Sequence, residues 1–140
     1  MCRAITVTLV SIISVAPAIV CADPPKSVVS INLCADQLLV LLAERDVLRS
    51  VTFLSSRPSL SVVADRVRDI PPNYGEAEEV LAMQPDLVVA GRFAARPAVS
   101  MLRRLGVAVL ELPIPETFDE IRGQIVSPSN VLGAQARGDN

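Results

Sequence analysis

Aromatic side chains gather where the predicted strands end. The chain contains one tyrosine, three phenylalanines and no tryptophan. Each ring lies at or just after the expected carboxyl end of a strand: Phe53, Tyr74, Phe93 and Phe118. Ligands of open parallel sheets bind beyond the carboxyl ends of the strands, and aromatic rings there suit a large planar or apolar ligand. We therefore expect at least two of the rings to face a cleft, although each could instead only cover the end of the sheet.

Polar residues at the same strand ends could contact such a ligand. Arg92 follows a strand that ends at Gly91, where a glycine permits a sharp turn. Its guanidinium could pair with a carboxylate or phosphate in two-pronged geometry, and a solvated surface arginine is the alternative. Tyr74 could coordinate iron through its phenolate, although packing or hydrogen bonding is the simpler expectation. Asn32 and Cys34 end the first strand, and Cys34 is expected to be a small buried apolar residue rather than a ligand-contacting thiol.

Three glutamates begin a predicted helix: Glu76, Glu78 and Glu79. Acidic residues in the first turn complement the positive end of the helix dipole. They could also form an exposed acidic patch that docks against arginines of a partner protein. Both interpretations stay open at the level of the sequence.

Residue types that usually carry catalysis are missing. The chain has no histidine, which removes the commonest general base and a common metal ligand. It also lacks the Gly-x-Gly-x-x-Gly, P-loop, Gly-x-Ser-x-Gly and Cys-x-x-Cys patterns. We therefore predict that the protein is not an enzyme and has no metal site, cofactor or catalytic residue of its own. With 13 basic and 15 acidic residues and no basic stripe, the composition also argues against nucleic-acid binding.

The predicted strands and helices that position these residues alternate along the chain. Strands are predicted at residues 28–33, 47–54, 86–91 and 107–112, with a very short one within residues 69–72. Helices are predicted at residues 35–44, 59–68, 76–84, 97–105 and 118–126. The alternation predicts right-handed βαβ units, and strands this apolar indicate a sheet that is covered on both faces. The predicted fold class is α/β, a three-layer lobe with a parallel sheet of four or five strands.

The amino terminus has the pattern of a secretory signal peptide. Residues 1–22 combine a positive start at Arg3, an apolar run over residues 4–20 and small residues before a cleavage point. A retained membrane anchor and lipidation at Cys21 are the alternatives, but the run is shorter than a stable span needs. Cleavage would leave Cys34 as the one cysteine, so no internal disulfide is expected, and the location would be periplasmic.

A change of composition divides the rest of the chain near residue 126. Residues 23–126 form the predicted lobe. The sequence SPSN at residues 127–130 is expected to break the last helix, and residues 133–140 are small and polar. We therefore expect residues 127–140 to be a disordered or truncated tail.

Three sequence blocks resemble the class III periplasmic binding proteins, the group that carries ferric siderophores, haem and cobalamin. The first block is VVSINLCADQLL at residues 28–39. The second, NYGEAEEVLAMQPDLVVAG at residues 73–91, is similar to the family's helix, Pro-Asp-Leu-Val strand and ligand-edge glycine. The third runs from LRRLGV at residues 102–107 to LP at residues 112–113 and is similar to the next helix and strand. The resemblance covers about residues 28–125.

This resemblance implies a function and a set of site residues. Members of the family hold a ligand between two α/β lobes, joined by one long helix, and deliver it to the permease of an ABC importer. The ligand edge of the first lobe would here include five residues: Asn32, Cys34, Tyr74, Arg92 and Phe93. Glu78 matches the place of an acidic residue that docks on the permease. The expectation is a monomeric periplasmic substrate-binding component for an iron complex, haem or a cobalamin-like ligand.

The chain departs from the family because the second lobe is missing after residue 126. The expectation is therefore a truncated product that contains the amino-terminal lobe only. Two other functions stay open. One is a noncatalytic single-lobe interaction module that docks on a permease, and the other is an enzyme with a nucleotide-type α/β fold.

Overall fold

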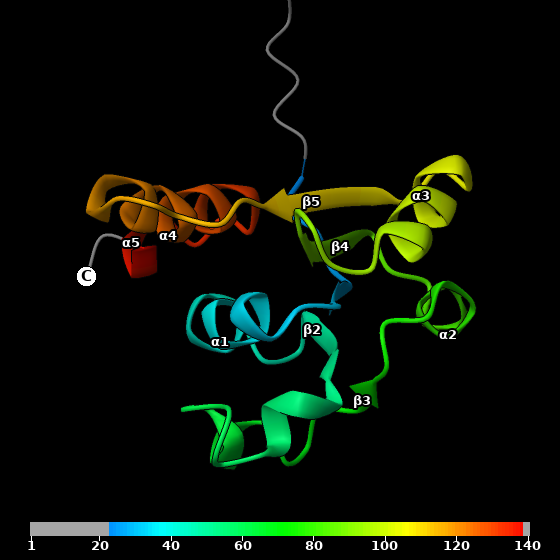
Figure 1. Cartoon of the computed structure of the whole chain (residues 1–140), viewed down its shortest axis with the longest axis horizontal. Helices are drawn as coiled ribbons and strands as arrows, with labels where there is room; N and C mark the ends of the chain where they lie inside the picture. Colours follow the sequence, from blue (N-terminus) through cyan, green and yellow to red (C-terminus); the bar gives the residue numbers. More distant parts are fainter. Residues whose placement is uncertain (1–22, 139–140) are drawn as a thin grey trace, which may run out of the picture.

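The fold is a parallel sheet between two layers of helices. The computed structural model describes residues 23–138, so the predicted signal peptide and Cys21 lie outside the described residues. The elements are β1 (Val28–Ser30), α1 (Leu33–Leu42), β2 (Leu48–Thr52), η1 (Phe53–Ser56), η2 (Ala64–Arg66), β3 (Pro72–Asn73), α2 (Ala77–Ala82), β4 (Leu87–Gly91), α3 (Arg96–Arg104), β5 (Ala108–Leu112), α4 (Phe118–Val131) and α5 (Gln135–Gly138), where η marks a 3-10 helix. The five strands are parallel and lie in the order β3-β2-β1-β4-β5 (Figure 1). The predicted α/β class with a parallel sheet is confirmed.

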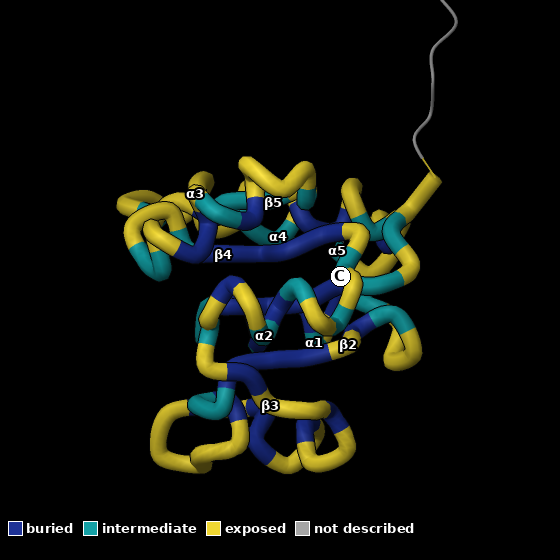
Figure 2. Tube along the Cα trace, turned by 90° about the vertical axis from the view of Figure 1, so that its right-hand side faces the viewer, coloured by how far each residue is buried: buried dark blue, intermediate teal, exposed yellow. Residues whose placement is uncertain are grey.

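Alternation along the strands builds a core on each face of the sheet. Val28 and Val89 point to a cluster that includes Leu39 of α1, whereas Val29 and Val88 point to a cluster with α2 and α3. Helices α1, α4 and α5 accordingly lie on one side of the sheet, and α2 and α3 lie on the other (Figure 1). Strand β4 is buried along most of its length between these layers (Figure 2). Within residues 23–138, no helix is both long enough and apolar enough to cross a bilayer.

The strand order changes direction at β1. Strand β1 pairs with β2 on one side and with β4 on the other, so the chain builds the sheet outward first in one direction and then in the opposite one. Such a switch point opens a crevice outside the carboxyl ends of the two central strands, where ligands of open α/β sheets bind. The fold therefore directs attention to the residues that follow β1 and β4.

Residues 59–68 do not form the predicted helix. They consist of turns and the short 3-10 helix η2, although Val63 and Val67 are buried as the helical spacing suggested. Ser61 explains the difference, because its hydroxyl accepts a hydrogen bond from the Val63 N–H at 3.3 Å. Serine side chains that bond to nearby backbone compete with helix formation. The expected short strand at residues 69–72 is also displaced, because β3 comprises Pro72 and Asn73.

Helix α4 runs through the predicted break at residues 127–130, so the expected end at residue 126 is wrong. The helix begins with a capping box in which Thr117 Oγ1 accepts from the Glu120 N–H, and Glu120 Oε2 accepts from the Thr117 N–H, both at 3.2 Å. Pro128 cannot donate within the helix, a defect that costs about 3 kcal/mol or more in a helix interior. Pro128 is less than 2% exposed, and α4 packs against α1 and α5. Burial of the proline therefore offsets the lost hydrogen bond.

The last described residues are attached to the end of α1. The Arg137 Nε donates to the carbonyl oxygen of Leu42 at 2.7 Å, and its Nη1 lies 2.5 Å from Glu44 Oε1. The arginine thus satisfies one of the carbonyl groups that the end of α1 leaves without a helical partner. Where a disordered tail was expected, the structure has the end of α4 and the short helix α5. The boundary of the lobe at residue 126 stays a prediction.

Candidate ligand-binding site

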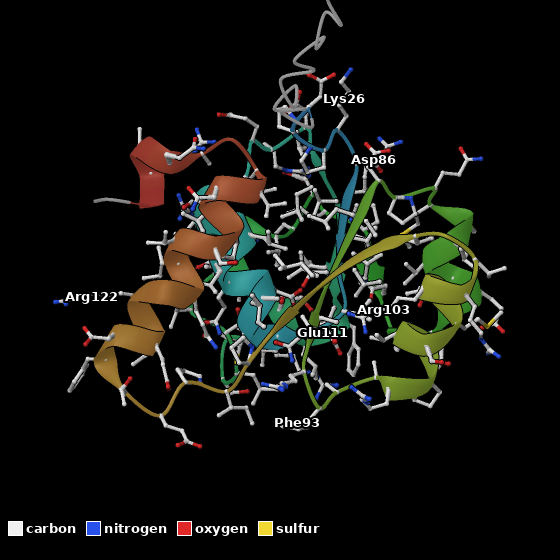
Figure 3. The ribbon with its side chains drawn as sticks, turned by 90° about the horizontal axis from the view of Figure 1, so that it is seen from above. Lys26, Asp86, Phe93, Arg103, Glu111 and Arg122 are labelled. Carbon is white, nitrogen blue, oxygen red and sulfur yellow. The ribbon has the colours of Figure 1, made fainter. Side chains whose placement is uncertain are left out.

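The predicted site residues all follow strand ends at one edge of the sheet. Because the strands are parallel, their carboxyl ends meet at the same edge. The residues that follow these ends are Asn32 and Cys34 after β1, Tyr74 after β3, and Arg92 and Phe93 after β4. Figure 3 shows Phe93 at the end of the sheet opposite Lys26 and Asp86, which mark the amino-terminal edge. The structure therefore brings the five residues to one edge.

Two of the aromatic rings form a stacked pair. The centroids of Phe53 and Tyr74 are 4.9 Å apart, and the ring planes differ by 26°. Arg57 lies over the Phe53 ring, with its Cζ 5.4 Å from the centroid. Tyr74 is 69% exposed, whereas Phe53 is only partly exposed. The pair therefore offers an aromatic surface to solvent at the β2–β3 side of the edge.

Tyr74 is held by hydrogen bonds to its neighbours along the chain. The buried Asn73 donates from Nδ2 to the Ser30 carbonyl oxygen and to Ser50 Oγ, both at 2.8 Å, which ties β3 to β1 and β2. Its Oδ1 accepts from the Gly75 N–H at 3.1 Å, and Gly75 has a φ of 79°, a conformation that glycine adopts readily. The Tyr74 N–H donates to Glu79 Oε2 at 2.8 Å. The backbone on both sides of the tyrosine is therefore fixed.

Phe53 is held by a buried carboxylate on another element. Asp36 of α1 is fully buried, and its Oδ2 accepts from the Thr52 N–H at 3.2 Å and from the Thr52 and Ser55 hydroxyls at 2.5 Å each. Its Oδ1 has no hydrogen-bond partner among the described residues. Burial raises the pKa of the Asp36 carboxyl above its usual range, and the hydroxyls of Ser30, Ser55 and Thr52 act in the opposite direction. The turn that carries Phe53 is thus anchored in the core.

Arg92 and Phe93 form a smaller and more open group beside β4. The Arg92 N–H donates to the Leu112 carbonyl oxygen at 2.9 Å, which extends the β4–β5 ladder past Gly91. The Arg92 Cζ lies 5.9 Å from the Phe93 centroid, and Phe93 is 70% exposed. Among residues 23–138, Arg92 forms no ion pair, whereas Arg96 and Arg103 both pair with Glu111. Figure 3 labels Arg103 and Glu111, which lie close together. The guanidinium of Arg92 therefore remains available to a ligand anion.

Asn32 has a structural role that was missed in the sequence, although asparagine is a preferred residue at the start of a helix. Its Oδ1 caps α1 by accepting from the N–H groups of Cys34 and Ala35 at 3.0 and 3.1 Å. A Cβ on Gly91 would lie 2.6 Å from Asn32 Nδ2, so the glycine leaves room for this side chain. The chain does turn directly after Gly91, where the Ala94 N–H donates to the Gly91 carbonyl oxygen at 3.1 Å. Because the φ of Gly91 is not positive, the glycine serves the close packing between β4 and the cap of α1.

Cys34 is exposed, so its predicted burial is wrong. The residue lies in the first turn of α1, whose buried face is made by Ala35, Asp36, Leu39 and Leu42. Position 34 falls outside that face, and the thiol is therefore open to solvent at the edge of the sheet.

The three glutamates around the start of α2 have different surroundings. Glu76 precedes the helix and makes no capping hydrogen bond with its side chain. Glu79 is used by the Tyr74 backbone, as described above. Glu78 is exposed, and no hydrogen bond or ion pair within residues 23–138 engages its side chain. Glu78 is thus accessible to a partner.

Two hollows formed by the described residues are not lined by any of the aromatic rings. A hollow of about 590 Å³ lies near the starts of β2 and β3, at the edge opposite the candidate site, and is lined by charged residues such as Arg45, Asp46 and Arg49. A hollow of about 280 Å³ lies between β5 and α4, beside Leu112 and Gln124. Tyr74 and Phe93 are exposed, so the candidate site at the carboxyl edge is an open surface and not a closed pocket. The part of the chain that the structure describes holds no cluster of three or more His, Cys, Asp or Glu side chains suited to a metal ion.

Solved structures of periplasmic binding proteins share this fold. A possible iron-binding (periplasmic solute-binding) protein from Staphylococcus epidermidis superposes with a TM-score of 0.70 at 16% identity, over 82% of this chain and 45% of its own. A periplasmic heme binding protein from Pseudomonas aeruginosa gives a TM-score of 0.66 at 22% identity, over 82% and 41%. The periplasmic vitamin B12 binding protein of Vibrio cholerae gives a TM-score of 0.64 at 23% identity, over 83% and 45%.

These likenesses confirm the predicted fold. The described chain has the α/β fold of a class III periplasmic binding protein, and it spans less than half the length of the three structures, as expected for one lobe. Comparisons with protein-family models and with curated protein sequences give no match.

Two residues that anchor the site were missed in the sequence. Asp36 had a detectable signal, because it shares the face of α1 with Ala35 and Leu39, where a charged residue is unusual. Asn73 had no comparable signal, since its neighbours predicted only a loop before a helix. Its partners Ser30 and Ser50 come from distant strands and become apparent only in the sheet.

Proposed function

We propose that the carboxyl edge of the sheet binds an iron complex, haem or a cobalamin-like ligand, and that the chain serves as the substrate-binding component of an ABC importer. One observation carries this proposal: the exposed rings of Tyr74 and Phe93 lie on the edge that contains the switch point between β1 and β4. The fold shared with iron, haem and vitamin B12 binding proteins supports the choice of ligands.

The chemistry of the edge suits a flat ligand with acidic groups. Burial of an aromatic ring stabilises a complex by roughly 1.5–3 kcal/mol, so Tyr74 and Phe93 together can supply much of the affinity. Arg92 lies beside Phe93 and has no ion pair within residues 23–138, which allows a charge-assisted hydrogen bond to a ligand carboxylate. Cys34 contributes an exposed thiol at the same edge. Asn32 supports the edge by capping α1 and does not contact the ligand directly.

Titration with haem, cobalamin and a ferric siderophore tests the proposal. Binding is followed by the visible absorbance of each ligand, so that the reporter survives when Tyr74 is replaced. The double variant Tyr74→Ala, Phe93→Ala is expected to bind at least about tenfold more weakly, which corresponds to about 1.4 kcal/mol. Leu105→Ala is the control, because Leu105 is 58% exposed but precedes β5 at the opposite edge. Equal affinity of the double variant and the control would contradict the assignment of the edge.

Export to the periplasm is the second part of the proposal. Residues 1–22 are fused to a reporter that is active only in the periplasm. We expect activity from this fusion and none from a fusion that starts at residue 23. A cytoplasmic location of the first fusion would contradict the proposed location.

Docking on the permease is the third part, with Glu78 as the contact. Its exposed carboxylate is suited to pair with arginines of a permease. In a pull-down with the permease of an ABC importer for metal chelates, Glu78→Lys should reduce capture, whereas Glu116→Lys, an exposed glutamate elsewhere, should not. Capture that is unaffected by Glu78→Lys would contradict this role. Capture that needs Glu78 in the absence of any ligand would favour the noncatalytic interaction module.

A further inference from the structure

The position of Phe53 depends on a carboxylate that belongs to a different element. Thr52 directly precedes Phe53 and Ser55 follows it, and three donors of these two residues converge on Asp36 Oδ2. Asp36 itself is fixed within α1, where its N–H donates to the Asn32 carbonyl oxygen at 2.9 Å. The carboxylate therefore connects the capped start of α1 with the turn that follows β2.

The start of the 3-10 helix η1 has no side-chain cap that could replace this anchor. The hydroxyl of Thr52, in the N-cap position of η1, makes no capping bond and donates instead to Asp36 at 2.5 Å. Hydrogen bonds to an ionised carboxylate are about twice as strong as those between neutral groups. The direction in which Phe53 leaves the sheet thus depends on α1 as well as on its own turn, where the Ser56 hydroxyl donates to the Phe53 carbonyl oxygen at 2.9 Å.

The second ring follows the neighbouring strand, because β3 pairs with β2 in a register that places Asn73 beside Thr52. Tyr74 is held between the buried Asn73 and the carboxylate of Glu79, and Asn73 reaches β1 and β2 through Ser30 and Ser50. The distance of 4.9 Å between the ring centroids therefore depends on the pairing of β2 with β3 and on the hydrogen bonds that hold the two turns after these strands. Displacement of either turn separates the rings.

We propose that Asp36 is a positioning residue: it holds the turn of Phe53 so that this ring supports the exposed ring of Tyr74. The ring geometry is a property of the chain alone, and only its consequence for ligand affinity rests on the proposed function. A supported tyrosine loses little freedom when a flat ligand stacks on it, since its conformation is already fixed.

Aromatic NMR cross-peaks of the ligand-free chain test the ring geometry. One tyrosine and three phenylalanines give a simple aromatic spectrum, so the cross-peaks between Phe53 and Tyr74 can be assigned. We expect Asp36→Ala to lose them and Asp36→Asn to keep them, because the amide oxygen can still accept from Thr52 and Ser55. Cross-peaks that persist in Asp36→Ala would overturn the proposal.

Two further variants separate positioning from a general loss of stability. Val99→Ala removes two buried methyl groups on the opposite face of the sheet, where Val99 is 2% exposed, and should lower stability while the cross-peaks persist. If Asp36→Ala does not fold, the variant Thr52→Val, Ser55→Ala removes two of the three donors and leaves the carboxylate in place. Its cross-peaks should weaken by at least about twofold relative to Val99→Ala, because the carboxylate then retains one of its three bonds. Unchanged cross-peaks in this variant would contradict the proposal.

Haem titration tests whether the position of Phe53 affects ligand affinity. We expect Asp36→Ala to bind haem at least about fivefold more weakly than Val99→Ala. If the wild type binds no ligand while Asp36→Ala loses the cross-peaks, the proposed function fails and the positioning role stands. If the wild type binds and Asp36→Ala keeps both cross-peaks and affinity, the positioning role fails alone.

Discussion

The two halves of the carboxyl edge are built in opposite ways. The half formed by β1, β2 and β3, which we call the polar half, contains buried polar residues in these strands and in the adjacent α1 and η1: Ser30, Asp36, Ser50, Thr52, Ser55 and Asn73. In the half formed by β4 and β5, which we call the apolar half, strand β4 buries only apolar side chains from Leu87 to Ala90. The aromatic pair lies above the polar half, and the exposed Arg92 and Phe93 follow the apolar half.

The apolar half contributes mainly to the stability of the sheet, whereas the polar half also fixes the positions of the turns at its edge. Apolar burial is nondirectional, so β4 can stabilise the sheet without determining where Phe93 points. A buried polar network stabilises the fold only when its members keep their partners, and it therefore fixes the positions of the turns that provide them. We infer that the polar half is the more firmly held part of the candidate site.

The largest effect is expected when the polar half loses its anchor. Asp36→Ala leaves the Thr52 and Ser55 hydroxyls buried without an acceptor, which should lower the free energy of unfolding by about 3 kcal/mol or more. Val89→Ala, in the apolar half, should cost about 2 kcal/mol through lost burial. Urea denaturation at constant m-value measures both. A smaller loss for Asp36→Ala than for Val89→Ala would remove the distinction between the halves.

Two replacements of glycine test the boundary between the halves, where β4 packs against the cap of α1. Gly91→Ala places a Cβ 2.6 Å from Asn32 Nδ2, so the cap of α1 must move, at a cost of about 2 kcal/mol. Gly123→Ala is the matched control in an exposed part of α4, where nothing lies within 4 Å and alanine should stabilise the helix by up to about 1 kcal/mol. Faster hydrogen exchange at the Cys34 and Ala35 amides should accompany only the first change. Equal effects of the two replacements would contradict the close approach of β4 to α1.

The stability of the polar half should depend on pH through Asp36. Burial raises the pKa of this carboxyl above its usual value of 3.8, so the folded protein holds the proton more strongly than the unfolded chain does. The free energy of unfolding should therefore fall as the pH rises from about 3.8 through the folded pKa. Asp36→Asn removes this dependence, so the stability of the wild type relative to Asp36→Asn should decrease over that interval. A relative gain with rising pH would mean that the hydrogen bonds from Thr52 and Ser55 outweigh burial.

The smallest effect is expected at two helix ends next to the apolar half. Gln84 follows α2 with a φ of 51°, and Gly106 follows α3 with a φ of 82°. A glycine avoids steric strain in this conformation, so Gln84→Gly should stabilise the protein by about 0.5–1 kcal/mol and Gly106→Ala should destabilise it by about 1 kcal/mol. Thermal unfolding measures both. Changes of the same sign would show that the two helix ends are not equivalent.

Much of the fold was encoded locally and was therefore predictable. Alternating strand and helix patterns gave the parallel sheet, and the predicted residues do meet at one edge. The errors arose where distant contacts decide. The turns at residues 59–68 bury Val63 and Val67 without a helix, and α4 continues through Pro128 because that residue is buried.

The sequence by itself determined the class of fold, the strand ends and the residue types that follow them, because hydrophobic periodicity and turn residues act over short distances. Only the tertiary structure decided which of these side chains remain free. Cys34 became exposed, and Asp36 became the anchor of the turn that carries Phe53. The cap at Asn32, in contrast, is a local contact that was readable from the sequence. The role of Asp36 depends on donors from β2 and the turn after it, which meet its carboxylate only in the folded chain and therefore leave no trace in local spacing.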